Sequence, residues 1–219
     1  MILSDGDIVR ALHQGDIQIR PQPKMASNSS WPRIIQPASI DVRLGREFLV
    51  FVPSDHTHID PREDNTDLMR PVWIEPRKCF VLHPHEFALG CTIEEITVSP
   101  KYAVRLEGKS SLGRLGLVIH STAGYVDPGF EGTVTLELSN ASPLPIQLWP
   151  GMPIAQLSLV LLSSPARRPY GHPELGSKYQ KQREPVASRA HLASGDYCVA
   201  EDPSRCDLFA CRHCIGDPC

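Results

Sequence analysis

The stretch that decides the fold is Thr133-Val134-Thr135-Leu136-Glu137-Leu138, in which polar and apolar side chains alternate without a break. Successive side chains of a β-strand point to opposite faces, so this stretch predicts a strand with one apolar face turned toward a core. The opposite face carries Glu137. If the strand lines a barrel pocket, Glu137 points into it beside Thr135. The alternative is a solvent-facing glutamate on a half-exposed strand, which is the commoner situation for a single Glu.

Strand patterns of the same kind continue on both sides of this stretch. Ile40, Val42 and Leu44 alternate with polar neighbours, and the 21 prolines suit many turns and few long helices. Ser4-Asp5-Gly6-Asp7 resembles a capping box that begins one short helix, which Gly15 can end. Further strands are predicted at 48–50, 79–83, 87–92, 102–106, 116–120, 145–149 and 154–162. The chain is therefore expected to be mainly β, a distorted β-barrel or jelly roll with a short N-terminal helix.

A polar loop stands before the central strand, and it reads Gly108-Lys109-Ser110-Ser111-Leu112-Gly113-Arg114. Glycine permits a close approach of the backbone to a ligand, and turn amides can point at phosphate oxygens. Lys109 and Arg114 add positive charge. The loop lacks the spacing of a Walker A motif, so on composition alone a solvated turn is the better explanation.

Length and charge limit the classes of function that the chain can have. The 219 residues are enough for one domain with a hydrophobic core, and the formal net charge is -3. A generic nucleic-acid binder would usually be basic, so a long DNA or RNA partner is disfavoured. No signal peptide and no apolar run long enough to cross a bilayer is found, which favours a cytoplasmic protein that does not bind membranes.

Composition predicts a body at 1–191 and a separate tail at 192–219. Residues 21–33 and 54–71 are polar or charged and are expected to be loops. The tail holds five of the seven cysteines, a departure for which disorder is the simplest expectation. Cys79 and Cys91 lie in the predicted strands and are expected to be ordinary buried thiols.

Several motifs together resemble the dCTP deaminase family of the dUTPase-like superfamily. They are Gln36 to Leu44, Gly108 to Arg114, Thr122 to Phe130, Thr135-Leu136-Glu137, Trp149-Pro150-Gly151-Met152 and Ser177-Lys178-Tyr179-Gln180. As a set these motifs are highly specific, and they follow the family order over roughly residues 1–190. The resemblance implies a dUTPase-like barrel or jelly roll, assembled as a homotrimer whose sites are shared between subunits.

The resemblance also implies roles for individual residues. Glu137 matches the catalytic proton acceptor and donor, and Ser110 with Arg114 matches the residues that place the attacking water. Asp127 matches the residue at the sugar and belongs to the catalytic set. The matched substrate contacts are Lys109, Ser110, Ser111, Leu112, Gly113, Arg114, Asp127, Thr135, Leu136, Glu137, Gln156, Tyr170, Lys178 and Gln182. Mg²⁺ is expected to accompany the triphosphate, because it prefers phosphate oxygens and water.

A zinc-dependent alternative can be weighed on the same sequence. His172-Pro173-Glu174 fits H-x-E and Cys211 with Cys214 follows, but position 210 is Ala where the zinc deaminase signature requires Pro. We interpret the match as chance, and we expect neither a protein metal site nor zinc in catalysis. The tail contains enough Cys and His to bind zinc by itself, although its spacing is loose for a structural site.

The number of reactions is the last question that the motifs address. Thr-Ala-Gly followed by an aromatic residue, here Gly124 and Tyr125, is similar to the deaminases that continue to dUMP. Single-activity deaminases tend to carry a His-Arg-type pair at these positions. The main expectation is therefore dUMP formation, and the alternative is a deaminase that releases dUTP. A pure dUTPase or a non-catalytic nucleotide-sensing trimer is disfavoured, because neither needs Glu137 as a proton shuttle.

Overall fold

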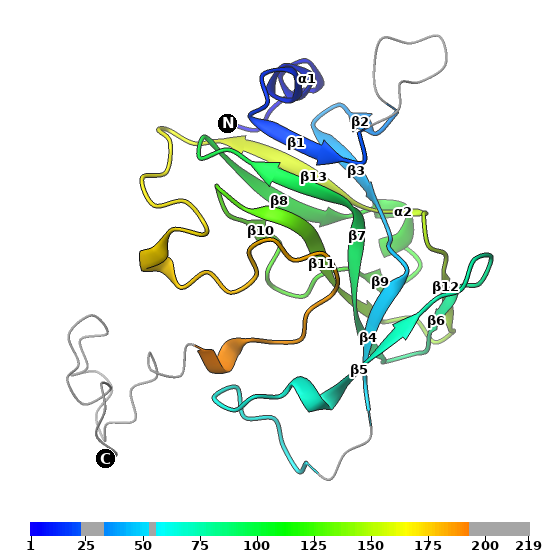
Figure 1. Ribbon diagram of the computed structural model, residues 1–219. Coiled ribbons are helices and arrows are strands. Elements are labelled where there is room, and N and C mark those ends of the chain that lie inside the picture. The colour runs from blue at the N-terminus through cyan, green and yellow to red at the C-terminus, as the bar shows by residue number, and fades with distance from the viewer. Residues whose placement is uncertain (23–32, 53–55, 193–219) are drawn as a thin grey trace, which may run out of the picture. The chain divides into compact units, whose positions relative to one another are not determined.

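The computed structural model describes residues 1–22, 33–52 and 56–192, which are built mainly from antiparallel strands (Figure 1). The helices are α1 (Asp5–His13), α2 (Ser110–Gly113) and the 3-10 turns η1 (Thr66–Leu68) and η2 (Pro173–Leu175). The strands are β1 (Ile17–Arg20), β2 (Ile35–Gln36), β3 (Ser39–Arg43), β4 (Glu47–Phe51), β5 (Met69–Trp73), β6 (Phe80–Leu82), β7 (Phe87–Val98), β8 (Tyr102–Gly108), β9 (Leu117–Val118), β10 (Tyr125–Val126), β11 (Glu131–Asn140), β12 (Ile146–Leu148) and β13 (Pro153–Leu161).

Two larger sheets and one hairpin-sized sheet organise the described strands. One sheet has the order β5-β4-β7-β11-β9, with β1 also paired to β7. The second has the order β10-β8-β13-β3-β2, and β12 pairs with β6 separately. This mainly β, jelly-roll-like arrangement confirms the predicted fold class, while the strand order of the described residues forms no closed barrel.

Both larger sheets contribute to one hydrophobic core. Leu136 and Leu138 of β11 are fully buried, and Leu106 of β8 and Leu157 of β13 are each only 2% exposed. Burial of such side chains contributes roughly 1.5–3 kcal/mol each, so the shared core fixes the two sheets against each other. The polar face of β11 is thereby held in one orientation.

The predicted helix and the predicted central strands are present. Ser4 is the N-cap of α1, but its side chain does not accept a hydrogen bond from a helix N–H as a capping box requires, and its hydroxyl instead donates to Asp7 Oδ2 at 3.3 Å. Gly15 follows the helix with a positive φ of 75°. The alternation of β11 is confirmed, with buried Val134, Leu136 and Leu138 and a half-buried Glu137.

Sequence analysis missed four strands, of which β2 and β10 have only two residues each. β1 has only four residues, and its alternating burial becomes visible once it pairs with β7. β5 lies partly within the stretch predicted as a charged loop and contains Pro71, which suits its position at the edge of a sheet. Most of the predicted 21–33 loop, and all but the first residue of the predicted 192–219 tail, lie outside the described residues.

The chain divides into two compact units. One contains Met1–Phe51 and Pro71–Val186, and the other contains Val52–Arg70 and the chain from Ala187 onward. Every predicted site residue belongs to the first unit.

In the second unit, hydrogen bonds from Arg62 lower the pKa of Asp60 to about 2. None of the helices in the described ranges has the length and apolar character needed to cross a membrane.

Candidate active site

Glu137 lies in the middle of β11, where a neighbouring segment supplies its one hydrogen-bond donor. The carboxylate Oε2 accepts a hydrogen bond from the backbone N–H of Ser121 at 2.9 Å. The backbone N–H of Glu137 donates to Ile119 O at 2.9 Å, so the 119–121 segment runs directly beside the strand. Glu137 Oε1 has no hydrogen bond within the described residues, which leaves it available to a water or a substrate proton.

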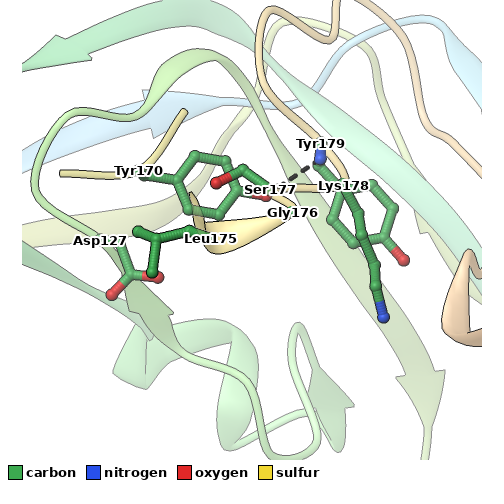
Figure 2. A pocket seen from close by; sticks show the side chains of 7 residues that line it. All are labelled: Asp127, Tyr170, Leu175, Gly176, Ser177, Lys178 and Tyr179. Carbon is green, nitrogen blue, oxygen red and sulfur yellow. Dashed lines mark hydrogen bonds between the residues drawn. The ribbon is translucent and has the colours of Figure 1, made fainter. Parts of the chain in front are cut away.

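Asp127 lies at the edge of a cavity of about 280 Å³ next to the turn between β10 and β11 (Figure 2). The opposite wall is formed by the segment that follows β13, and its lining residues are Tyr170, Leu175, Gly176, Ser177, Lys178 and Tyr179. Tyr179 N donates to the hydroxyl of Tyr170 at 2.9 Å. Burial, followed by smaller effects that include Asp127, raises the pKa of Tyr170, so its hydroxyl remains protonated at neutral pH.

The end of this segment is bound to β11. Gln182 Nε2 donates to Thr133 O at 2.7 Å and to Thr135 Oγ1 at 2.9 Å, while Thr133 N donates to Gln182 O at 3.0 Å. Gln182 Oε1 is buried and has no hydrogen-bond partner among the described residues. A buried carbonyl oxygen without a donor is costly, so this atom is a natural acceptor for a ligand N–H or O–H.

The Gly108–Arg114 loop forms the short helix α2 at the end of β8. Lys109 Nζ is paired with Asp41 Oδ1 at 2.7 Å, and both side chains are largely shielded from solvent. Ser110, Ser111 and Arg114 are exposed. Their side chains are therefore accessible to a ligand or to another subunit.

Gln156 lies on the same sheet as this loop. In the register of the sheet it stands between Asp41 of β3 and Glu107 of β8, and Ser39 Oγ donates to Gln156 Oε1 at 3.4 Å. The structure therefore brings Gln156 close to the carboxylate that holds Lys109. This polar row belongs to the sheet that does not contain Glu137.

The predicted site residues thus form two groups within one chain. Asp127, Tyr170 and Lys178 share the cavity, and Gln182 is bound to Thr135, two residues from Glu137. Lys109 to Arg114 and Gln156 form the other group, with Leu112 half-buried beside the core and Leu136 fully buried within it. In the described part of the chain, no hydrogen bond or ion pair joins the second group to Glu137 or Asp127.

Gly124 and Tyr125 differ sharply in their surroundings. A Cβ at Gly124 would lie 2.9 Å from Leu106 O and 2.9 Å from the His120 ring, so glycine is needed here for packing. Tyr125 is 57% exposed and presents its ring away from the core.

The described residues contain no group of three or more His, Cys, Asp or Glu side chains arranged to bind a metal ion. Cys91 is buried, as predicted, and Cys79 is half-buried. His172 caps the 3-10 turn η2, where its Nδ1 accepts from Glu174 N at 3.3 Å. The cysteines of the predicted tail lie outside the described residues.

Three residues at the site had no predicted role. Asp41 pairs with Lys109, Ser121 donates to Glu137, and Gln180 contacts the turn that carries Asp127. Asp41 and Gln180 fall inside the motifs quoted above, which was the available signal. Ser121 acts through its backbone N–H, and no sequence pattern reports such a contact.

Comparisons with known proteins show what the chain is similar to. Residues 2–162 match the family model described as dCTP deaminase-like. The chain is 52% identical over 192 residues to a dCTP deaminase, dUMP-forming, of Kocuria rhizophila, covering 88% of this chain and 96% of that protein. It is 53% identical over 192 residues to the protein of the same description from Clavibacter michiganensis, covering 88% and 92%.

A solved structure shares the fold. The 2'-deoxycytidine 5'-triphosphate deaminase of Agrobacterium tumefaciens superposes with a TM-score of 0.54 at 21% identity. The match covers 74% of this chain and 48% of that chain, so this chain spans about half the length of the solved one.

Proposed function

The chain belongs to the dCTP deaminase-like family, and we propose that it converts dCTP to dUMP, ammonia and pyrophosphate. The observation that carries this function is the 52–53% identity, over more than nine-tenths of their length, to relatives named dCTP deaminase, dUMP-forming. That description favours dUMP formation over release of dUTP. It also favours an enzyme over a non-catalytic nucleotide-sensing trimer.

The first reaction is a hydrolytic deamination at C4 of the cytosine ring. Glu137 takes a proton from the attacking water as the water oxygen bonds to C4, and passes this proton to ring N3. It then takes the proton of the new C4 hydroxyl and gives it to the amino group, so that the C4–N bond breaks, ammonia leaves and the C4 carbonyl of uracil forms. The free Oε1 supports this role, because Ser121 N occupies only the other carboxylate oxygen.

The second reaction cleaves dUTP between its α and β phosphates. Asp127 is proposed to orient or deprotonate the water that attacks the α-phosphorus, and pyrophosphate is the leaving group. Its position at the edge of the cavity supports this role, since Tyr170 and Lys178 line the same cavity. Lys178 supplies a positive charge for the phosphate oxygens, and Gln182 Oε1 offers an acceptor near Glu137.

The triphosphate would be bound by the Lys109–Gly113 loop, with Ser110 and Arg114 also placing the water. We propose that this loop comes from a neighbouring subunit of a homotrimer. The separation of the two groups in one chain and the exposure of Arg114 support a shared site. Gln156 and Thr135 would complete the nucleotide contacts.

A shared site can be tested by complementation. Glu137→Gln and Arg114→Ala variants, each expected to be inactive, are mixed by co-expression. If every site takes Arg114 from one subunit and Glu137 from the next, about one quarter of the sites in randomly mixed trimers are intact. Recovery of about a quarter of wild-type activity supports sharing, and no recovery contradicts it.

We propose that Mg²⁺ is bound by the phosphate oxygens of the substrate and by water, and not by a dedicated protein site. Mg²⁺ prefers phosphate oxygens and water, and the described residues offer no cage of three carboxylate, His or Cys ligands. When bound with the triphosphate, Mg²⁺ would neutralise part of its charge.

We propose a cytoplasmic location, because nucleoside triphosphates do not cross membranes unaided. A long nucleic acid is not proposed as a partner.

Product analysis tests the proposed function directly. Purified protein is incubated with dCTP and Mg²⁺, and ammonia, dUTP, dUMP and pyrophosphate are quantified. Equal amounts of dUMP, ammonia and pyrophosphate are expected, and Asp127→Asn should suppress pyrophosphate formation. Accumulation of dUTP equal to the ammonia, with no pyrophosphate, would show a single-activity deaminase.

The turn before Asp127 offers a second test of the product. Gly124→His with Tyr125→Arg should shift the product toward dUTP, because the new Cβ collides with Leu106 O and moves the turn. Asp127 would then lose its alignment with the α-phosphate. An unchanged ratio of dUMP to dUTP in a stable double variant would remove the turn from the second reaction.

Independence from zinc is tested with the tail removed. Truncation after Arg189 eliminates five cysteines, and deamination should remain largely intact. A zinc chelator should also leave the rate unchanged when Mg²⁺ is resupplied. Activity that is lost on truncation or chelation, and restored by zinc alone, would contradict the metal-free reaction.

A further inference from the structure

We propose that Gln180 is a positioning residue that holds the Tyr170–Gln182 segment against the turn carrying Asp127. Its side-chain amide contacts Gly129 in that turn and Glu131 at the start of β11. Gln180 Nε2 donates to Gly129 O at 2.9 Å, and Gln180 Oε1 accepts from Glu131 N at 3.1 Å. The inference rests on the proposed function, because it concerns the geometry of the same cavity.

The same amide also reaches the start of its own segment. Gln180 Nε2 lies 3.4 Å from Tyr170 O and donates to it more weakly. One side chain therefore connects the Asp127 turn with Tyr170, the residue that opens the cavity wall.

Backbone hydrogen bonds flank the amide on either side. Tyr170 N donates to Pro128 O at 2.7 Å, and Lys181 N donates to Glu131 O at 2.7 Å. Together with the hydrogen bonds of Gln182 to Thr133 and Thr135, these bonds anchor the two ends of the segment. The amide supplies the contact between them, so it limits how far Tyr170 and Lys178 can move from Asp127.

Two glycines provide the room that this contact requires. Gly129 has φ of 92°, and a Cβ there would lie 2.6 Å from Pro169 Cβ and 2.9 Å from Tyr170 O. Gly171 has φ of 91°, and its Cβ would lie 2.9 Å from Gln180 Nε2. Both positions therefore require glycine for conformation and for space, which indicates a closely fitted contact and not an incidental one.

The chemistry of an amide matters at this position. Gln180 must donate to carbonyl oxygens through one atom and accept from an N–H through the other, which only an amide does at this length. Glu at this position keeps the acceptor but places a carboxylate against the carbonyl oxygens of Gly129 and Tyr170. It also adds negative charge beside a cavity that is proposed to receive phosphates.

The test compares Gln180→Ala and Gln180→Glu with Gln147→Ala, a control that removes an exposed glutamine from β12. KM and kcat for dCTP are measured with Mg²⁺ in the full-length chain. We expect KM to rise about 5–30-fold in Gln180→Ala and further in Gln180→Glu, with kcat reduced less than about 3-fold. The control should match the wild type.

Trypsin supplies a readout that does not depend on catalysis. Lys178 and Lys181 flank the amide, so release of the segment should increase cleavage after both residues by at least about 5-fold, as located by mass spectrometry. Unchanged KM and unchanged cleavage in both variants would overturn the proposal. Loss of kcat together with a large fall in Tm would also overturn it, since that result describes a purely structural residue.

The failure of this inference can be distinguished from failure of the proposed function. If the wild type releases no ammonia from dCTP, the function is wrong, and the cleavage pattern still decides whether Gln180 holds the segment. If the wild type is active and the variants behave like the control, only the positioning role of Gln180 is wrong.

Discussion

Replacing Glu137 with Gln separates the catalytic role of this residue from any structural one. Gln keeps the shape of the side chain and an oxygen that can accept from Ser121 N, but it cannot take a proton from water. A positioned general acid or base contributes typically ~10²–10⁴-fold to a rate. We therefore expect kcat for ammonia release to fall by at least that factor, equivalent to about 3–5 kcal/mol of transition-state stabilisation.

The structural cost of the same change is much smaller. The Ser121 N–H that bonds to the carboxylate belongs to an exposed residue, so water can replace a weakened contact. A single hydrogen bond contributes about 0.5–1.5 kcal/mol, and part of this one is retained with Gln. The melting temperature should therefore change by no more than about 4 °C, which separates misfolding from loss of chemistry.

The assay measures ammonia release at saturating dCTP and Mg²⁺, alongside thermal unfolding of each variant. Glu131→Gln is the matched control, because it makes the same chemical change on the same strand outside the cavity lining. The reasoning is refuted if Glu137→Gln retains turnover within about 3-fold of the wild type. An equal loss in the control variant would show that the effect is not specific to Glu137.

Three further outcomes follow from charge and burial. Burial raises the pKa of Cys91 to about 12, so its alkylation by iodoacetamide at pH 8 should be much slower than that of half-buried Cys79, as peptide mass spectrometry can measure. Burial, and then the charge of Glu184, raise the pKa of Glu47. The contribution of Glu47 to stability is therefore complete at low pH, where the side chain is protonated, and is lost as pH rises. Glu47→Gln should increase Tm at pH 7 by about 1–3 °C and leave Tm unchanged near pH 4. Removal of Mg²⁺ with a chelator should raise KM for dCTP at least ~10-fold, and a KM unaffected by the chelator would count against a magnesium-bound substrate.

Local alternation predicted the central strand well because burial of one face imposes a period of two. Thr133 to Leu138 was predicted as a strand, and the structure extends it to Glu131–Asn140 with a bulge between Thr133 and Thr135. The period therefore placed Glu137 opposite the core correctly. The added length comes from pairing with β7, which is not a local property of the sequence.

The contacts of the site were much harder to predict than its residues. Lys109 and Asp41 are 68 residues apart, and Glu137 meets Ser121 through a backbone atom. Lys109 and Asp41 each lie within a family motif of this chain. The motifs do not indicate that the two side chains form an ion pair. Gln180 was quoted within a motif, and only the fold shows that its amide lies against Gly129 and Glu131.

The division of the site between two sheets has a chemical consequence. A general base must remain free to accept a proton, and an adjacent Lys or Arg would bind its carboxylate and lower its basicity. Lys109 is already paired with Asp41 on the second sheet, and Glu137 on the first sheet has one backbone donor and an open oxygen. In the described part of one chain neither Lys109 nor Arg114 is paired with Glu137, whereas Lys178 lines the cavity beside Asp127. If a second subunit brings the Arg114 loop to this face, base and cation meet around the substrate, and the nucleotide separates the two charges that would otherwise neutralise each other.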